Sequence, residues 1–337
     1  MPPLPAKRKW LCRAVVICSG LTGWVLAASW VAPLAAQNEV IRVDVNLVRV
    51  LATVKNPAGE LVGSLEKSDF QIFDNGVRQE ISVFERQTDQ PLSIALLVDT
   101  SGSTGIELRY ELDSVSRFLK ALFSSGNPDD KVALYSFNYQ VTLHNYFTHN
   151  HGPLERSLKT LRSEAGTSLY DAIYLAAHDL ESREGRKIMV VVTDGGDTTS
   201  SKDFHSAVRA AQYADSVIYP VLVVPIKNDA GRNIGGENAL TTLAAWTGGR
   251  VFAPTIRSLD DAFAAIIKEL RTQYLLGFYP KNVPLSRDPF HRLELRVQRA
   301  DLRVVTRNGY YGDAISDSGS PGARTSIAPQ RKGHQEK

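Results

Sequence analysis

The chain has almost no cysteine. Its 337 residues include two, Cys12 and Cys18, and both lie within the first 36 residues. If that segment is removed, no thiol remains for a disulfide bond, for nucleophilic catalysis or for a cysteine-bound metal. Any stable fold in the remaining chain must therefore come from packing of apolar side chains, which the hydrophobic content of 43% allows.

The chain also lacks a strong excess of either charge. The formal net charge is +3, but residues 1–36 carry four basic residues and no acidic one. Without them, 35 Lys and Arg stand against 36 Asp and Glu, a formal charge of −1. A near-neutral chain lacks the basic surface that a phosphate backbone attracts, so we expect no nucleic-acid partner.

Residues 1–36 have the layout of an export signal. Basic residues at positions 7–9 precede an apolar stretch from Val15 to Leu34, and Ala35-Ala36 precede the polar residue Gln37. This order is typical of a secretory signal peptide. The apolar stretch is also long enough for an uncleaved anchor. We expect cleavage and export to the periplasm, cell envelope or extracellular space, with membrane anchoring through the N-terminus as the alternative.

An unbroken apolar run, Ile94–Val98, leads into Asp99-Thr100-Ser101-Gly102-Ser103. Such a short run predicts a buried parallel strand, after which the chain turns at Gly102 into a helix. One carboxylate and two hydroxyls then lie at the carboxyl end of a central strand, where open α/β sheets place their ligands. Hard oxygen donors of this kind suit Mg²⁺ or a similar cation.

Two later stretches strengthen this interpretation. Gly166-Thr167-Ser168 opens a second helix and offers the Thr167 hydroxyl, and the apolar run Lys187–Thr193 delivers Asp194 followed by two glycines. Three element ends, in order along the chain, thus each offer an oxygen ligand. The pattern resembles a von Willebrand factor type A (VWA) domain with a metal-ion-dependent adhesion site, and the resemblance covers about residues 92–272.

The resemblance implies a ligand set and a mode of binding. In that family D-x-S-x-S, a Thr and an Asp in a T-D-G context hold a divalent cation, Mg²⁺ or another such as Mn²⁺ or Ca²⁺. Carried over by position, the ligands are Asp99, Ser101, Ser103, Thr167 and Asp194. One coordination position stays open for an Asp or Glu carboxylate of a protein partner, so the implied role is protein binding and not catalysis.

Three alternatives to this interpretation stay open. Asp99 and Ser101 could simply cap the following helix. The metal could stabilise an assembly scaffold without contacting a partner. The site could also belong to a metal-dependent hydrolase, although no G-x-S-x-G elbow surrounds Ser101 or Ser103 and no histidine is placed by sequence to activate them.

Strands and helices alternate across the middle of the chain. Apolar runs at 94–98, 132–137, 187–193 and 217–224 predict strands, and amphipathic repeats between them predict helices. This alternation predicts an α/β fold with a doubly wound, mostly parallel sheet, similar to the Rossmann arrangement. We expect Val141–Phe147 to form an antiparallel edge strand.

β-rich segments flank this core. In the first, Asp74-Asn75-Gly76 predicts a tight hairpin turn into a strand over Val77–Phe84. Three more strands are predicted between residues 274 and 307, and we expect them to rejoin the first segment in one β-sandwich-like module. A bacterial VWFA-related branch is similar in carrying a D-F-x-[IV]-x-[DE]-[ND]-G stretch before the VWA core, here Asp69–Gly76.

The expected organisation has five parts. They are a signal peptide or anchor at 1–36, the first part of the β module at 38–91, the VWA domain at 92–272, the second part of the β module at 273–312, and a disordered tail at 313–337.

Several smaller expectations concern single residues. His149 and His151 lie close together in the sequence, but no regular element fixes a third ligand for Zn²⁺, so we expect solvated histidines. Asp197 and Asp179 are expected to be solvated. Ser258 and Asp261 predict a capping box at the last core helix. Arg250–Phe252 predicts a short strand.

Overall fold

The computed structural model describes residues 47–86, 90–102, 108–223, 233–284 and 287–312. The expected signal peptide, the expected disordered tail and the candidate ligand Ser103 lie outside these residues. Within the described ranges, no helix is both long and apolar enough to cross a membrane.

The core of the fold is a five-stranded sheet with the strand order β7-β6-β5-β8-β9. Strand β5 pairs in parallel with β6 and β8, β8 pairs in parallel with β9, and β7 runs antiparallel to β6 at the edge. The strands are β5 (Leu92–Asp99), β6 (Lys131–Phe137), β7 (Val141–Thr148), β8 (Arg186–Thr193) and β9 (Ser216–Leu222). The predicted α/β fold with a mostly parallel sheet is confirmed, as is the antiparallel edge strand.

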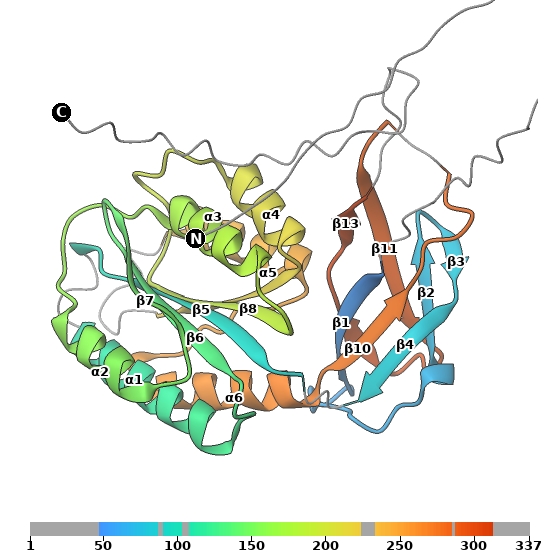
Figure 1. Ribbon diagram of the computed structural model, residues 1–337, viewed down its shortest axis with the longest axis horizontal. Coiled ribbons are helices and arrows are strands. Elements are labelled where there is room, and N and C mark those ends of the chain that lie inside the picture. Colours follow the sequence, from blue (N-terminus) through green and yellow to red (C-terminus); the bar gives the residue numbers. More distant parts are fainter. Residues whose placement is uncertain (1–46, 87–89, 103–107, 224–232, 285–286, 313–337) are drawn as a thin grey trace, which may run out of the picture. The chain divides into compact units, whose positions relative to one another are not determined.

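Helices cover both faces of this sheet, as Figure 1 shows. One face packs against α1, α2 and α6, and the other packs against α3, α4 and α5. The helices are α1 (Leu108–Ser125), α2 (His151–Thr160), α3 (Leu169–Glu181), α4 (Phe204–Tyr213), α5 (Ile234–Thr247) and α6 (Leu259–Thr272). This double coverage explains why all eight residues of β5 are buried and why its sequence is apolar without alternation.

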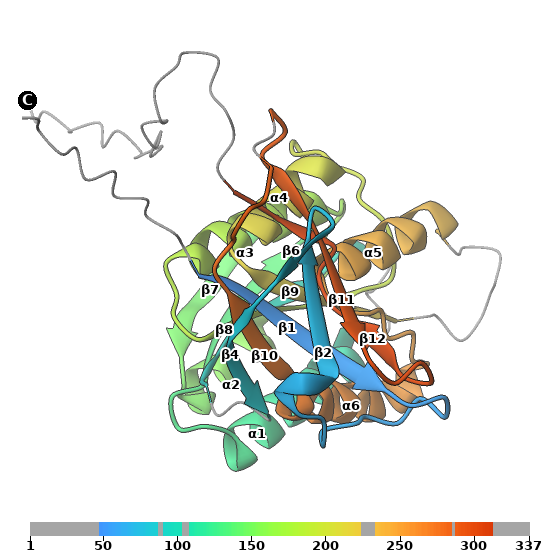
Figure 2. The same cartoon turned by 90° about the vertical axis from the view of Figure 1, so that its right-hand side faces the viewer.

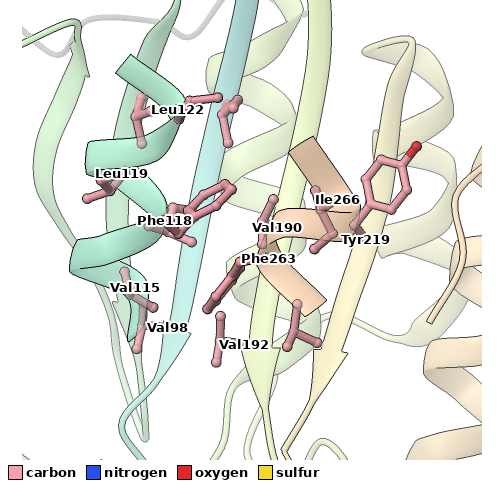
Figure 3. Packing of buried hydrophobic residues seen from close by; sticks show 14 of the residues in the cluster. Val98, Val115, Phe118, Leu119, Leu122, Val190, Val192, Tyr219, Phe263 and Ile266 are labelled. Atoms are coloured by element: carbon pink, nitrogen blue, oxygen red, sulfur yellow. The ribbon is translucent and has the colours of Figure 1, made fainter. Parts of the chain in front are cut away.

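The two faces of β5 contribute to two separate cores. Ile94, Leu96 and Val98 face α1 and α6, whereas Ala95 and Leu97 face α3. In the first core, the rings of Phe118 from α1 and Phe263 from α6 stack with centroids 4.8 Å apart, and Figure 3 shows them beside Val190 and Val192 of β8.

The flanking segments form two antiparallel four-stranded sheets, seen from the front in Figure 2. Their strand orders are β12-β1-β10-β4 and β13-β11-β2-β3. The strands are β1 (Val48–Lys55), β2 (Phe70–Asp74), β3 (Val77–Gln79), β4 (Ile81–Arg86), β10 (Tyr274–Phe278), β11 (Phe290–Val297), β12 (Arg303–Val305) and β13 (Gly309–Tyr311). Strands that precede the α/β core thus pair directly with strands that follow it, while the domain limits themselves remain predictions.

The hairpin turn forms as its sequence predicts, but the strand after it does not. Asn75 and Gly76 have φ angles of 47° and 81°, which a tight hairpin needs, and Asp74 pairs with Val77. The predicted single strand over Val77–Phe84 is wrong. The chain leaves the first sheet after Gln79, and β4 pairs with β10 in the other sheet. A local pattern cannot show such a switch, because it depends on pairing with β10, which lies far along the chain.

Two other expectations need correction. Arg250–Phe252 forms a single bridge, from Phe252 to Val221, and not a strand. Ser258 does precede α6, but its side chain makes no capping hydrogen bond. The Ser258 hydroxyl instead donates to the Thr255 carbonyl at 3.2 Å, so the predicted capping box does not form.

Candidate metal site

Asp99 lies at the carboxyl end of the central strand and has no solvent exposure. Its carboxylate accepts hydrogen bonds from the Ser101 backbone N–H at 2.8 Å and from the Thr193 hydroxyl at 2.6 Å. The Ser101 side chain also bonds to it. Burial raises the pKa of Asp99 to about 6, the hydrogen bonds from Thr193 and Ser101 oppose this rise, and the charge of Asp194 adds to it. None of its hydrogen-bond donors carries a charge, so the buried anion lacks a countercharge among them.

Thr167 is held in place by its backbone alone. Its N–H donates to the hydroxyls of Thr198 and Thr199 at 2.9 and 3.1 Å, and its carbonyl accepts the N–H groups of the same two residues. The residue is 8% exposed, and its own hydroxyl makes no hydrogen bond with any residue that the structure describes. A hydroxyl without such a partner can coordinate a ligand that the described part of the protein does not itself supply.

Gly166 allows the Thr167 loop to pack closely against Tyr139. It has a φ of +86°, and a Cβ added to it would lie 2.9 Å from the Cα of Tyr139. Only glycine satisfies both constraints without strain. The Tyr139 N–H donates to the Ala165 carbonyl at 3.0 Å, so the Thr167 loop is fixed against the end of β6.

Asp194 follows β8 directly. Its neighbour Thr193 is fully buried and joins β8 to Asp99 by the hydroxyl bond described above. The Asp194 carboxylate is half-buried and accepts no hydrogen bond from the described part of the chain, while its charge is felt at Asp99. The charges of these two carboxylates therefore repel each other at one edge of the sheet.

Hydrogen bonds to backbone carbonyls connect the loops at this edge of the sheet. The Glu164 N–H donates to the Thr100 carbonyl at 2.9 Å, and the Ser163 hydroxyl donates to the Ser101 carbonyl at 2.9 Å. The Thr198 N–H reaches the Thr167 carbonyl at 2.9 Å. The segments that carry Asp99, Ser101, Thr167 and Asp194 thus form one connected rim, whereas Ser103 lies outside the described residues.

The donor set fits a hard divalent cation. It offers two carboxylates and hydroxyl groups, which is the chemistry that Mg²⁺ prefers. The described residues contain no cluster of three or more His, Cys, Asp or Glu that could hold a metal, so any cation here depends on the hydroxyls as well as on the two aspartates. The positive charge of a cation would offset the burial of Asp99.

The helix-capping alternative explains less. The Asp99 carboxylate also accepts a hydrogen bond from the Thr193 hydroxyl, which belongs to β8 and not to the following helix. The roles of Thr193, Thr198 and Thr199 were not predicted from the sequence. Their hydroxyls hold Asp99 and the Thr167 backbone in place, and no local signal separates them from ordinary loop residues.

Other polar candidates have structural partners. Asp197 accepts the N–H groups of Tyr170 and Ser200 at 3.2 and 3.3 Å, and Asp179 accepts the Tyr135 hydroxyl at 2.6 Å. Both therefore have a structural role, which corrects the expectation that they are solvated. His151 lies 3.7 Å from Glu155 at the start of α2, in a local pair on one helix.

Comparison with known proteins identifies the domain. Residues 94–196 match the family model described as von Willebrand factor type A domain. The chain contains a VWA domain. The comparison with curated proteins gave no significant match.

Several solved structures are similar to part of this chain. The vWF domain of the pilus tip protein Mfa5 from Porphyromonas gingivalis has a TM-score of 0.45 and 14% identity over 53% of this chain and 94% of that one. The PilB minor pilin from Streptococcus sanguinis has a TM-score of 0.44 and 13% identity over 55% and 62%. The protein BatB from Bacteroides thetaiotaomicron has a TM-score of 0.42 and 20% identity over 53% and 97%. At these scores the likeness says nothing about what this chain binds.

Proposed function

We propose that this protein is exported and uses its VWA domain to bind a protein ligand through a divalent cation. Asp99, Ser101, Ser103, Thr167 and Asp194 would hold the cation, with Mg²⁺ the expected metal and Mn²⁺ or Ca²⁺ the alternatives. When bound, the metal supplies a Lewis-acidic position that a carboxylate of the partner can occupy. The observation that carries the proposal is the fully buried Asp99 carboxylate, whose hydrogen-bond donors are all neutral.

Other residues of the rim hold the proposed metal ligands in position. Thr193 and Ser101 orient the Asp99 carboxylate, and Thr198 and Thr199 fix the backbone of Thr167. Thr198 and Thr199 bind the backbone of Thr167 and not its hydroxyl. Within the described residues, the Thr167 hydroxyl and the Asp194 carboxylate are therefore left for a ligand. We propose no catalytic step, since a bridging role requires only binding.

A metal-dependent capture experiment tests this proposal. Immobilised protein is exposed to cell-envelope extract with Mg²⁺ and then washed with EDTA. We expect the wild type and the control variant Asp113→Asn, whose carboxylate is exposed on α1, to retain the same proteins until EDTA is added. The Asp99→Ala variant should retain none of them. Capture that EDTA leaves unchanged would contradict the proposal.

The two other candidate roles give different results in the same samples. A scaffold with a structural metal would lose thermal stability in EDTA while its partners stay bound. A metal-dependent hydrolase would show turnover in a substrate screen with added Mg²⁺, and that turnover would disappear in Asp99→Ala.

A further inference from the structure

A small cavity lies at the edge of the five-stranded sheet opposite to the candidate metal site. Residues at the start of β8 and β9 line one side of it, and Leu51 of β1 and Leu275 of β10 line another. The cavity has a volume of about 30 Å³. This is room for one or two particles the size of a water molecule, so any occupant must be small.

Four basic side chains line this cavity, against one acidic side chain. The basic ones are Arg49, Arg186, Lys187 and Arg307, and the acidic one is Asp215. Arg186, Lys187 and Arg307 are only 2%, 7% and 8% exposed. Asp215 is paired with Arg307 at 2.5 Å, which leaves three of the four cations without a carboxylate in the lining. The cavity wall therefore carries an excess of positive charge in a largely buried setting.

Carboxylates outside the lining do not offset this excess. The charges of Asp130 and Glu85 act on Arg186, but Asp130 is itself paired with Arg271 at 3.1 Å. Burial, followed by the charge of Arg271, lowers the pKa of Arg186 to about 10, a fall that the two carboxylates do not prevent. The side chain of Glu181, whose charge acts on the cavity from α3, is 63% exposed, so solvent screens it. The surroundings thus lack the negative charge that the cavity wall calls for.

Two of the guanidinium groups also have donors without an acceptor. The terminal nitrogens of Arg307 donate to Asp215 and to the Arg49 carbonyl at 2.5 and 2.6 Å, but its Nε is buried and has no acceptor among the described residues. The Arg49 guanidinium forms no hydrogen bond or ion pair with any residue in the described ranges. Because buried donors are nearly always paired in stable folds, these groups require an acceptor that the described chain does not supply.

We propose that the cavity binds a small monovalent anion, with chloride as the expected ligand, through the guanidinium groups of Arg49 and Arg307. Chloride is a single atom that accepts hydrogen bonds from any direction, and its charge offsets the excess of buried cations. Phosphate and sulfate are too large for the cavity. The bound ion would connect β1 to the start of β8 and to the segment before β13, so it would stabilise the junction between the flanking strands and the VWA domain.

The dependence of stability on chloride tests this proposal. The full-length chain is unfolded with urea in EDTA, which keeps the candidate metal site empty, in sodium chloride or in sodium gluconate at the same ionic strength. Gluconate is too large for the cavity. We expect chloride at about 200 mM to raise the folding equilibrium constant of the wild type about tenfold over its value in gluconate. Arg49→Gln should stay folded in gluconate, because that guanidinium bonds to no described residue, and should gain less than about twofold from chloride.

A matched variant and a bromide soak complete the test. Arg156→Gln removes an exposed arginine outside the cavity lining and should gain as much from chloride as the wild type. Wild-type crystals soaked in sodium bromide should show an anomalous scattering peak within hydrogen-bond distance of the Arg49 and Arg307 guanidinium groups. The proposal is overturned if Arg49→Gln and the wild type gain equally from chloride. It is also overturned if bromide is absent from the cavity, because a water molecule then serves as the acceptor.

Discussion

Two regions of the protein treat buried carboxylates in opposite ways. At the carboxyl edge, Asp99 is fully buried and its hydrogen-bond donors are all neutral groups. Where α6 meets the β-sandwich, Glu269 is 1% exposed and is paired with Lys55 at 3.1 Å and Arg250 at 2.7 Å. Asp130, also fully buried, is paired with Arg271 at 3.1 Å. The structural carboxylates Glu269 and Asp130 are therefore paired with basic side chains. Asp99, at the rim where we place a cation, has only neutral hydrogen-bond donors.

The comparison predicts opposite effects of removing charge in the two regions. Glu269→Gln should lower the free energy of unfolding by about 2–4 kcal/mol, because it leaves Lys55 and Arg250 without their shared anion in a largely buried setting. Denaturant unfolding measures this loss. Glu181→Gln, at a glutamate whose side chain is 63% exposed, should change stability by less than about 0.5 kcal/mol. Equal stability of the Glu269→Gln variant and the wild type would show that the charge of Glu269 does not stabilise the fold, which contradicts the comparison.

Asp99→Asn should have the reverse effect when no metal is present. At neutral pH the wild type must hold Asp99 ionised in the fold although its pKa is raised to about 6. Replacing the carboxylate by an amide removes that cost, so in EDTA at pH 7.5 the variant should be more stable by about 1–2 kcal/mol. Added Mg²⁺ should stabilise the wild type and not the variant. A variant that is less stable than the wild type in EDTA would show that the Asp99 charge is structural.

The pH dependence of metal-free protein sharpens the same point. The folded-state pKa of Asp99, about 6, is higher than the ordinary value of 3.8, so the folded state binds the proton more tightly than the unfolded chain. Between these two pH values stability should fall as pH rises, and it should level off above about pH 7. Subtracting the curve of Asp99→Asn isolates this group. A difference curve without a slope between pH 4 and 6 would contradict the burial argument.

The sequence predicts much of this fold because the decisive patterns are local. The unbroken run Ile94–Val98 requires a strand covered on both faces, and Asp74-Asn75-Gly76 requires a hairpin turn. The switch of the chain between sheets after Gln79 was not predictable, because it depends on pairing with β10, almost two hundred residues away. Domain limits drawn from the sequence remain predictions.

The residue types of the candidate site were predictable from the sequence, but the hydrogen bonds that hold those residues in place were not. Asp99, Thr167 and Asp194 each follow a recognisable local pattern, and their segments lie on one connected rim. The Thr193 hydroxyl that holds Asp99 lies 94 positions away in the sequence, and Thr198 and Thr199 hold Thr167 from 31 and 32 positions away. Such contacts appear only once the strands are assembled.

Magnesium titration of a matched pair at Thr167 tests the central claim most directly. Thr167→Val keeps the side-chain shape and removes the hydroxyl, whereas Thr167→Ser keeps the hydroxyl. Because that hydroxyl bonds to no described residue, both variants should unfold in EDTA within about 1 kcal/mol of the wild type. By calorimetry, Thr167→Ser should bind Mg²⁺ within about threefold of the wild-type affinity, and Thr167→Val at least about tenfold more weakly, a loss of about 1.4 kcal/mol. Equal affinity of Thr167→Val and the wild type would show that no cation is held at this rim through Thr167.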